Sequence, residues 1–199
     1  MYKKPLQPRA IATEKRFLDA LNDLLKEKSL GQLSIDEIAD HAQLTRGAFL
    51  KRFGSKKQAL FVLWSSYCNL ASEQMVAIAA YMPKFACIED ACMHMSKTLE
   101  NIQTLEFSVN RAMHEDFQEN LRIDPQTKKI FLDCVDLMRQ AQKQFNLAGA
   151  ASDAGAFAAA QLLVTINYNY VLKAMPALPA NSQARHKLIG DVVALALRA

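Results

Sequence analysis

The sequence predicts an all-α protein, with a small N-terminal helix-turn-helix domain joined by a long helix to a larger helical domain. Apolar residues recur at the three- and four-residue spacing of helices through almost all of the 199 residues. Near the start, two short helical segments joined by a tight turn follow a longer one. Beyond Pro83 the helical segments become longer and more apolar. Gln161–Val171 contains β-branched and aromatic residues, but its alanine-rich flanks favour helix.

The first predicted helix follows a basic arm, residues 1–9, that contains two prolines. Thr13 is the expected N-cap of this helix and Gly31 its expected end. Its apolar residues recur with the spacing of one buried face. They are Phe17, Leu18, Leu21, Leu24 and Leu25.

Capping residues predict the next three helices. Ser34 and Glu37 have the spacing of a capping box and predict the start of a second, short helix. Thr45 and Ser55 are the expected N-caps of the third and fourth helices. The third helix is expected to end at Phe53-Gly54 and the fourth to run to about Ala80.

Five further helices are expected after Pro83. Asp124 followed by Pro125 is a strong start signal, because aspartate caps a helix and proline suits its first position. Residues 175–179 contain two prolines and predict a break. The expected helices are Lys84–Asn101, Glu106–Asn120, Pro125–Phe145, Ser152–Ala174 and Ser182–Arg198.

Positive charge is concentrated at the N-terminal end. Residues 1–60 contain 12 Lys and Arg against 7 Asp and Glu, whereas residues 61–199 contain 12 against 13. No acidic residue occurs from His41 to Ser72. This asymmetry indicates a polyanionic partner for the N-terminal domain. The same interval contains Arg46, Lys51, Arg52, Lys56 and Lys57.

Other classes of protein fit the sequence poorly. It contains no nucleotide-binding glycine loop, metalloprotease motif or nucleophile signature, so we expect neither an enzyme nor a cofactor. No apolar run is long enough to span a membrane and no signal peptide is evident, so we expect a cytoplasmic protein without membrane contact. The cysteines lack zinc-site spacing, and we expect no metal; they fit small core residues, with a redox pair as the alternative. They are Cys68, Cys87, Cys92 and Cys134.

The third helix has the pattern of a DNA-reading helix. Ala48, Phe49 and Phe53 would pack inward, so that small and basic residues face outward near its N-terminal end. Such residues reach base edges and phosphates of double-stranded DNA. The expected DNA-binding residues are Ser34, Thr45, Arg46, Gly47, Ala48, Leu50, Lys51, Arg52, Ser55, Lys56 and Lys57. We therefore expect a DNA-binding domain at residues 1–54, followed by a second helical domain at residues 55–199.

The order of motifs between residues 13 and 61 resembles the DNA-binding domain of the tetracycline-repressor (TetR) family. The similarity lies in SIDEIA at 34–39, LTRGAF at 44–49 and FGSKKQALF at 53–61. It implies a homodimer that binds a pseudo-palindromic operator, represses transcription and is released by a small molecule. It also implies that residues 55–199 form the regulatory and dimerisation domain. Leu50 and Arg52 depart from the family, which often has aromatic or histidine rings there that contact phosphates. Gln43 stands where the family often has glycine, and costs about 1 kcal/mol if that position is left-handed.

The resemblance also implies a dimer interface on the last two helices, with a monomer as the alternative. The expected interface residues are Phe157, Leu163, Tyr170, Leu188, Val192 and Leu195. A largely hydrophobic effector would bind among the central helices. The expected pocket residues are Trp64, Met93, Phe107, Asn110, Met113, His114, Phe117, Phe131, Met138 and Tyr168, which equally fit a plain core. The alternative function is a DNA-binding regulator without a small-molecule switch, controlled by a protein partner or acting as an activator.

Overall fold

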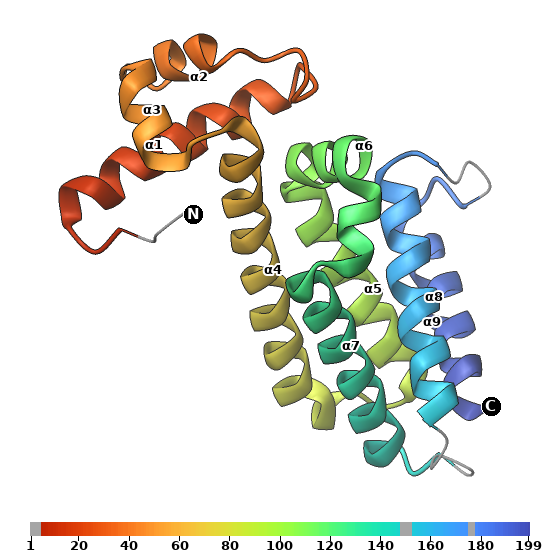
Figure 1. Cartoon of the computed structure of the whole chain (residues 1–199). Coiled ribbons are helices and arrows are strands. Elements are labelled where there is room, and N and C mark those ends of the chain that lie inside the picture. Colours follow the sequence, from red (N-terminus) through yellow and green to blue (C-terminus); the bar gives the residue numbers. More distant parts are fainter. Residues whose placement is uncertain (1–4, 148–152, 175–177) are drawn as a thin grey trace. The chain divides into compact units, whose positions relative to one another are not determined.

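The computed structural model describes residues 5–147, 153–174 and 178–199. All secondary-structure elements in these ranges are helices, which confirms the predicted all-α class (Figure 1). In chain order the elements are α1 (Pro8–Leu25), α2 (Ile35–His41), α3 (Arg46–Phe53), α4 (Lys56–Tyr81), the short 3-10 helix η1 (Met82–Lys84), α5 (Ile88–Leu105), α6 (Phe107–Ile123), α7 (Pro125–Gln144), α8 (Asp153–Val171) and α9 (Ser182–Arg198).

The chain forms two compact units. The first contains Met1–Tyr67 and Glu106–Arg122, and the second contains Cys68–Leu105 and Ile123–Ala199. Helices α4 and α6 therefore contribute residues to both units. The domain boundary expected after residue 54 stays a prediction.

The predicted helix starts at α2, α3, α4 and α7 are confirmed by their caps. The Glu37 N–H donates to Ser34 Oγ over 3.0 Å, and the Ser34 N–H donates to Glu37 Oε2 over 2.8 Å. Thr45 Oγ1 accepts from the Ala48 N–H over 3.2 Å. The hydroxyl oxygen of Ser55 and the carboxylate of Asp124 accept in the same way from Gln58 and Thr127. These side chains satisfy N–H groups that a helix leaves without partners in its first turn.

Several boundaries differ from the prediction, including the ends of α5, α6 and α8 by three or four residues. The N-cap prediction for Thr13 is wrong, because α1 begins at Pro8 with Gln7 as its N-cap, and the Thr13 hydroxyl donates to the Arg9 carbonyl inside the helix. Helix α1 ends at Leu25, before Gly31. Helix α5 starts at Ile88 because η1 and an extended Phe85 occupy the preceding residues. Residues 148–152 and 175–177, which include parts of the predicted α8 start and proline break, lie outside the described ranges.

The first unit is organised around an aromatic core. Phe17 of α1 and Phe49 of α3 are fully buried, with ring centroids 5.3 Å apart in an edge-to-face arrangement. The first part of α6 belongs to the same unit, where Ser108 Oγ donates to Asn22 of α1 over 2.5 Å. Arg111 of α6 donates to the Leu25 carbonyl over 2.5 Å, at the end of α1. Helix α6 is thus tied to the helix that supports α3.

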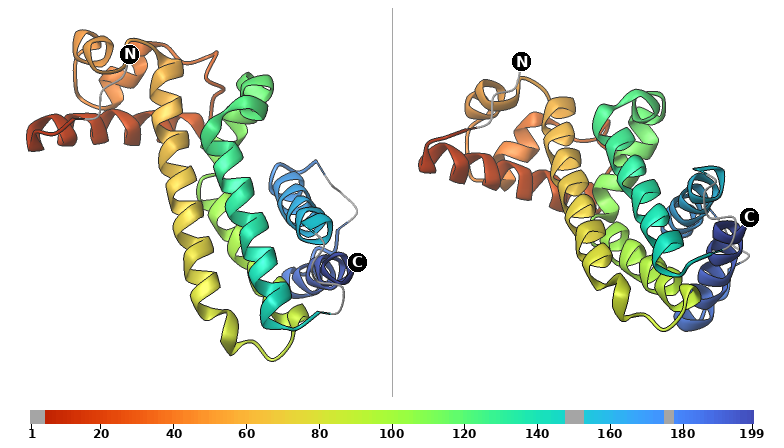
Figure 2. Two further views of the ribbon diagram at one scale, coloured as in Figure 1. Left: turned by 60° about the horizontal axis from the view of Figure 1, so that its bottom comes forward. Right: turned by 90° about the horizontal axis from the view of Figure 1, so that it is seen from below.

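The second unit has one hydrophobic core, to which α4, α5, α7, α8 and α9 all contribute. Helix α9 packs against α5 and α8, and α8 and α9 lie side by side in both views of Figure 2. A Cβ atom added at Gly190 of α9 would lie 2.8 Å from the Met93 nitrogen of α5. Glycine is therefore needed there for the two helices to approach so closely.

Candidate nucleic-acid interface

Helix α3 presents a small, polar and basic face to solvent. Phe49 and Phe53 are buried, as predicted, and fix the helix on Phe17 of α1. The residues on the opposite face are exposed to solvent. They are Thr45, Arg46, Gly47, Leu50 and Lys51. The predicted orientation of α3 is confirmed.

Gly47 lies on this face without a packing reason inside the chain. A Cβ atom added there would meet no heavy atom within 4 Å. Glycine in a helix costs about 1 kcal/mol relative to alanine. A residue with this cost and no internal contact fits a helix that must come close to an external surface.

The turn between α2 and α3 has an unusual backbone. Gln43 has a φ of 53°, so the left-handed conformation considered from the sequence is present. Arg16 of α1 donates to the Ala42 carbonyl over 2.6 Å and to the Gln43 carbonyl over 3.1 Å. These bonds occupy carbonyl groups at the end of α2 and hold the turn that places α3.

Several of the expected phosphate-binding cations have partners inside the first unit. Arg52 Nε donates to Glu14 Oε2 over 2.6 Å, and both side chains are mostly buried. Lys56 donates to the carbonyls of Leu30 and Leu33 in the loop before α2. Both contacts join residues more than 20 positions apart, which the spacing of charges cannot reveal. Arg52 and Lys56 therefore stabilise the domain directly, and their contact with DNA stays a prediction.

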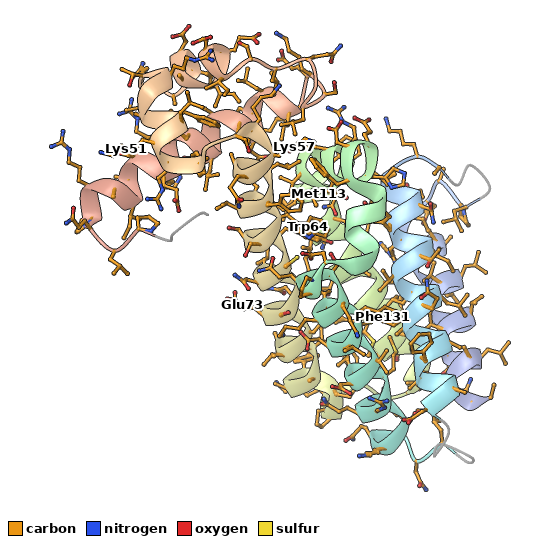
Figure 3. All side chains as sticks on the ribbon, viewed as in Figure 1. Lys51, Lys57, Trp64, Glu73, Met113 and Phe131 are labelled. Atoms are coloured by element: carbon orange, nitrogen blue, oxygen red, sulfur yellow. The ribbon has the colours of Figure 1, made fainter. Side chains whose placement is uncertain are left out.

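Arg46, Lys51 and Lys57 are exposed and better placed for an external anion. Arg46 forms a solvent-exposed ion pair of 2.6 Å with Asp36 of α2. Such pairs contribute about 0 to 1 kcal/mol to stability, so the guanidinium can leave Asp36 and bind an external anion at little cost in free energy. Lys57 lies 5.5 Å from the centroid of the Phe117 ring. Figure 3 labels both lysines, Lys51 on α3 and Lys57 at the start of α4.

Comparison with known proteins agrees with this geometry. Residues 17–62, which contain α2, α3 and their caps, match the family of bacterial regulatory proteins called the tetR family. The N-terminal domain belongs to the TetR family. The chain is accordingly a DNA-binding transcriptional regulator. A search of curated proteins found no match.

Solved structures show that the fold of the whole chain is shared with other proteins. A protein from Mesorhizobium loti assigned to the TetR-family transcriptional regulators is 13% identical, with a TM-score of 0.70 over 96% of this chain and 97% of its own. The fatty acid degradation regulator FadR from Bacillus halodurans is 14% identical, with a TM-score of 0.66 over 96% of each chain. PfmR from Thermus thermophilus is 17% identical, with a TM-score of 0.58 over 89% of this chain and 96% of its own.

The expected ligand-pocket residues fall into both units. In the first unit Trp64, Asn110, Met113 and Phe117 are buried, whereas Phe107 and His114 are half-buried. Trp64 of α4 is stacked on Tyr67, with ring centroids 4.8 Å apart. In the second unit Met138 is fully buried, and burial raises the pKa of the half-buried Tyr168 to about 12. Met93 and Phe131 are also half-buried, and Figure 3 labels Trp64, Met113 and Phe131.

A cavity in the second unit has a different lining. It has a volume of about 20 Å³ and lies among α4, α5, α7 and α8. Its lining is mostly apolar and includes Met75, Met95, Leu99, Leu137 and Leu163. None of the expected pocket residues lines it, so the ligand pocket stays a prediction. A space of this size has room for about one water molecule.

The expected interface residues on α8 and α9 are mostly exposed. Phe157, Leu188, Val192 and Leu195 are between 37% and 68% exposed. The expectation that Leu163 lies at the dimer interface is wrong, because this side chain is buried in the core of its own chain. Tyr170 is half-buried beneath the Arg185 guanidinium, whose central carbon lies 3.9 Å from the ring centroid.

A buried polar network in the second unit was not predicted. Ser96 Oγ of α5 donates to Asn167 of α8 and lies 3.1 Å from His186 Nδ1 of α9. Arg185 binds both carboxylate oxygens of Glu100, over 2.7 and 3.0 Å. These residues lie up to 90 positions apart in the sequence, so only the tertiary fold brings them together. The network fixes the start of α9 against α5.

The cysteines in the core are poor candidates for redox chemistry. Burial raises the pKa of Cys68, Cys92 and Cys134 to about 12. Since the thiolate is the reactive form, these three thiols are inert near neutral pH.

None of the described helices combines the length and apolar character needed to cross a membrane.

Proposed function

We propose that this TetR-family regulator is a homodimeric repressor that binds a pseudo-palindromic operator and leaves it when a small, largely hydrophobic ligand binds. The exposed face of α3 supports this proposal most strongly. Its small and basic residues stand on a helix fixed by Phe17, Phe49 and Phe53. A recognition helix needs this combination, because its side chains must reach base edges from a rigid support.

Dimerisation rests on the exposed apolar face of α9. Leu188, Val192 and Leu195 recur at helical spacing, and Phe157 of α8 adds a fourth exposed apolar residue. Contiguous apolar surface of this kind is typical of an association site. A two-fold dimer would present two α3 helices to half-sites about 34 Å apart, which is one turn of DNA.

Helix α4 provides a route for the ligand signal. It contributes a long segment to each unit, whereas α6 lies in the first unit except for Ile123. Within the first unit, Arg111 and Ser108 of α6 are hydrogen-bonded to the end of α1. A ligand that favours another position of α4 or α6 would change the presentation of α3 and lower the affinity for the operator.

A second candidate is a DNA-binding regulator without a small-molecule switch. The apolar cavity in the second unit favours it, because its volume of about 20 Å³ holds one water and not an effector. The larger hollow of about 480 Å³ in this unit is lined by charged residues such as Glu73, Lys129 and Asp133, which suit a hydrophobic compound poorly. Thermal denaturation in the presence of hydrophobic compounds separates the candidates. A ligand that binds the folded protein raises its melting temperature, whereas a protein-controlled regulator gives no response to any compound.

Selection of duplexes from a random DNA library tests DNA reading by the full-length protein. The expected result is enrichment of a sequence with two-fold symmetry, bound more weakly as salt rises. Enrichment of no sequence, with no salt-dependent binding to any duplex, would refute the proposed function. Sedimentation of the complex gives the number of chains on each duplex, for which we expect an even number.

A further inference from the structure

A basic hollow lies beside α3, on the side of the helix next to the beginning of α1. Its volume is about 310 Å³, and it lies wholly within the first unit. Helix α3 contributes Ala48, Lys51 and Arg52 to its lining. The start of α1 and the residue before it contribute Gln7, Arg9, Ala10 and Thr13.

Two cations of this hollow have no counter-charge in the described part of the first unit. Neither Arg9 nor Lys51 forms an ion pair, a side-chain hydrogen bond or a ring contact with a described residue. The third cation, Arg52, is paired with Glu14. Both Arg9 and Lys51 are exposed.

The other described cations of this unit have partners. Lys15, Lys26 and Lys28 are paired with carboxylates. Arg16, Lys56 and Arg111 donate to backbone carbonyls. Arg46 has Asp36, and Lys57 has the Phe117 ring. The two cations without partners therefore line the same hollow, although they come from helices far apart in the sequence.

Two exposed cations without counter-charges beside one concavity favour the binding of an anion there. A phosphodiester fits this arrangement, because the guanidinium of Arg9 can bind two of its oxygens and the Lys51 ammonium supplies a second positive charge. We propose that the hollow binds one phosphate of the DNA backbone, with Arg9 and Lys51 as its ligands. This inference rests on the proposed DNA binding and extends the DNA-contacting surface from α3 to the start of α1.

The position of the hollow favours a backbone contact over a base contact. Ala48 and Arg52 are half-buried and lie at the side of α3, whereas Arg46 and Gly47 lie on its exposed face. A helix in the major groove has a phosphate strand along each side. A contact from the hollow would therefore fix the register of α3 without reading sequence.

Salt-dependent binding of the full-length protein to its selected duplex tests the proposal. The variants are Arg9→Gln and Lys51→Gln. The control is Lys15→Gln, which removes one positive charge from α1 outside the hollow, at a lysine that is paired with Asp19. Each phosphate contact contributes about 0.9 to the slope of log K against log salt. Because both cations bind the same phosphate, we expect each single variant to lower the magnitude of that slope by up to about 0.9, and the double variant by no more than about 0.9, equally for specific and nonspecific duplexes. Slopes equal to that of Lys15→Gln would overturn the proposal.

Single methylphosphonate substitutions in the duplex identify the phosphate. We expect one neutralised phosphate outside the bases read by α3 to weaken binding of the parent protein but not of Arg9→Gln. If no single phosphate shows this coupling, the assigned contact is wrong. Melting temperatures equal to the parent's confirm that the variants are folded, which the exposure of both side chains leads us to expect.

Titration with inorganic phosphate separates a DNA contact from a site for a free anion. Saturable binding of inorganic phosphate that Arg9→Gln abolishes, with DNA binding unchanged, would overturn the proposal in favour of a small-anion site. A parent protein that binds no duplex at all would instead refute the proposed function. The two failures are therefore distinguishable.

Discussion

Arg16 of α1 donates a hydrogen bond of 3.1 Å to the carbonyl of Gln43, the residue that turns the chain from α2 into α3 with a φ of 53°. The same guanidinium group binds the Ala42 carbonyl over 2.6 Å. A side chain of the supporting helix thus holds a backbone conformation that L-residues seldom adopt. The placement of α3 depends on this contact as well as on the aromatic core.

Replacement of Gln43 by glycine should stabilise the protein. Glycine adopts positive φ without steric cost, so we expect Gln43→Gly to raise the free energy of unfolding by up to about 1 kcal/mol. Asp40→Gly, within helix α2, should lower it by a similar amount. Chemical denaturation measures both. A Gln43→Gly variant as destabilised as Asp40→Gly would show that the turn is not strained.

Local signals in the sequence predicted the elements around the DNA-binding face. Ser34, Thr45 and Ser55 cap their helices as expected, because a cap depends on residues three positions away. The N-cap prediction for Thr13 failed because a threonine hydroxyl inside a helix can also donate to the carbonyl four residues earlier. The fold and the orientation of α3 followed from such short-range patterns.

Long-range pairing could not be predicted. Arg52 looked available for DNA, and only the tertiary fold shows Glu14 beside it, 38 positions earlier in the chain. Leu163 lies on α8 as expected, yet on its inner face. Helical periodicity shows that a face is apolar, but it does not show whether its own chain or a partner covers that face.

Removal of the Glu14 carboxylate should affect stability and DNA binding in opposite directions. Glu14→Gln leaves the mostly buried Arg52 without its counter-charge, and we expect the free energy of unfolding to fall by about 1 to 3 kcal/mol. Nonspecific duplex binding should become tighter, because the side of α3 gains net positive charge. Glu27→Gln, an exposed residue of the same charge, is the control for both measurements. Unchanged stability in Glu14→Gln would contradict the structural role of this pair.

Stability should fall as the pH falls below the ordinary histidine range. Burial lowers the pKa of His186 below its ordinary value of 6.5, opposed by Glu100 and assisted by Arg185 and Lys97. Burial, assisted by Lys97, also lowers the pKa of His94. The unfolded chain then binds more protons than the folded one, so stability is complete above about pH 6.5 and is lost as the pH falls through the lowered pKa.

Melting temperatures between pH 7.5 and pH 5 measure this effect. Glu37, whose pKa is held at about 2 chiefly by the hydrogen bond from Lys28, titrates well below that window. We expect the parent to lose several degrees over the window and His186→Gln to lose less. Equal losses in the parent and in His186→Gln would show that His186 is not responsible.

A charge on the exposed face of α9 should prevent dimerisation. Leu195 is 68% exposed, and burying a carboxylate there at a two-fold interface would place two like charges close together. We expect Leu195→Glu to sediment as a monomer at concentrations where the parent is a dimer. Val76→Glu changes an equally exposed residue of α4 and should leave the parent's association state unchanged. A dimeric Leu195→Glu would exclude this face as the interface.

The most direct test of α3 as the DNA-reading helix is the affinity of Arg46→Ala for the selected duplex, with Lys15→Ala as the control of equal charge. Arg46 is exposed on α3, whereas Lys15 is paired with Asp19 on α1. A good base contact contributes about 1 to 3 kcal/mol of discrimination. We expect Arg46→Ala to bind the selected duplex roughly 5- to 150-fold more weakly than the parent, and Lys15→Ala to bind as the parent does. Equal affinity of Arg46→Ala and the parent at moderate salt would contradict this role of α3.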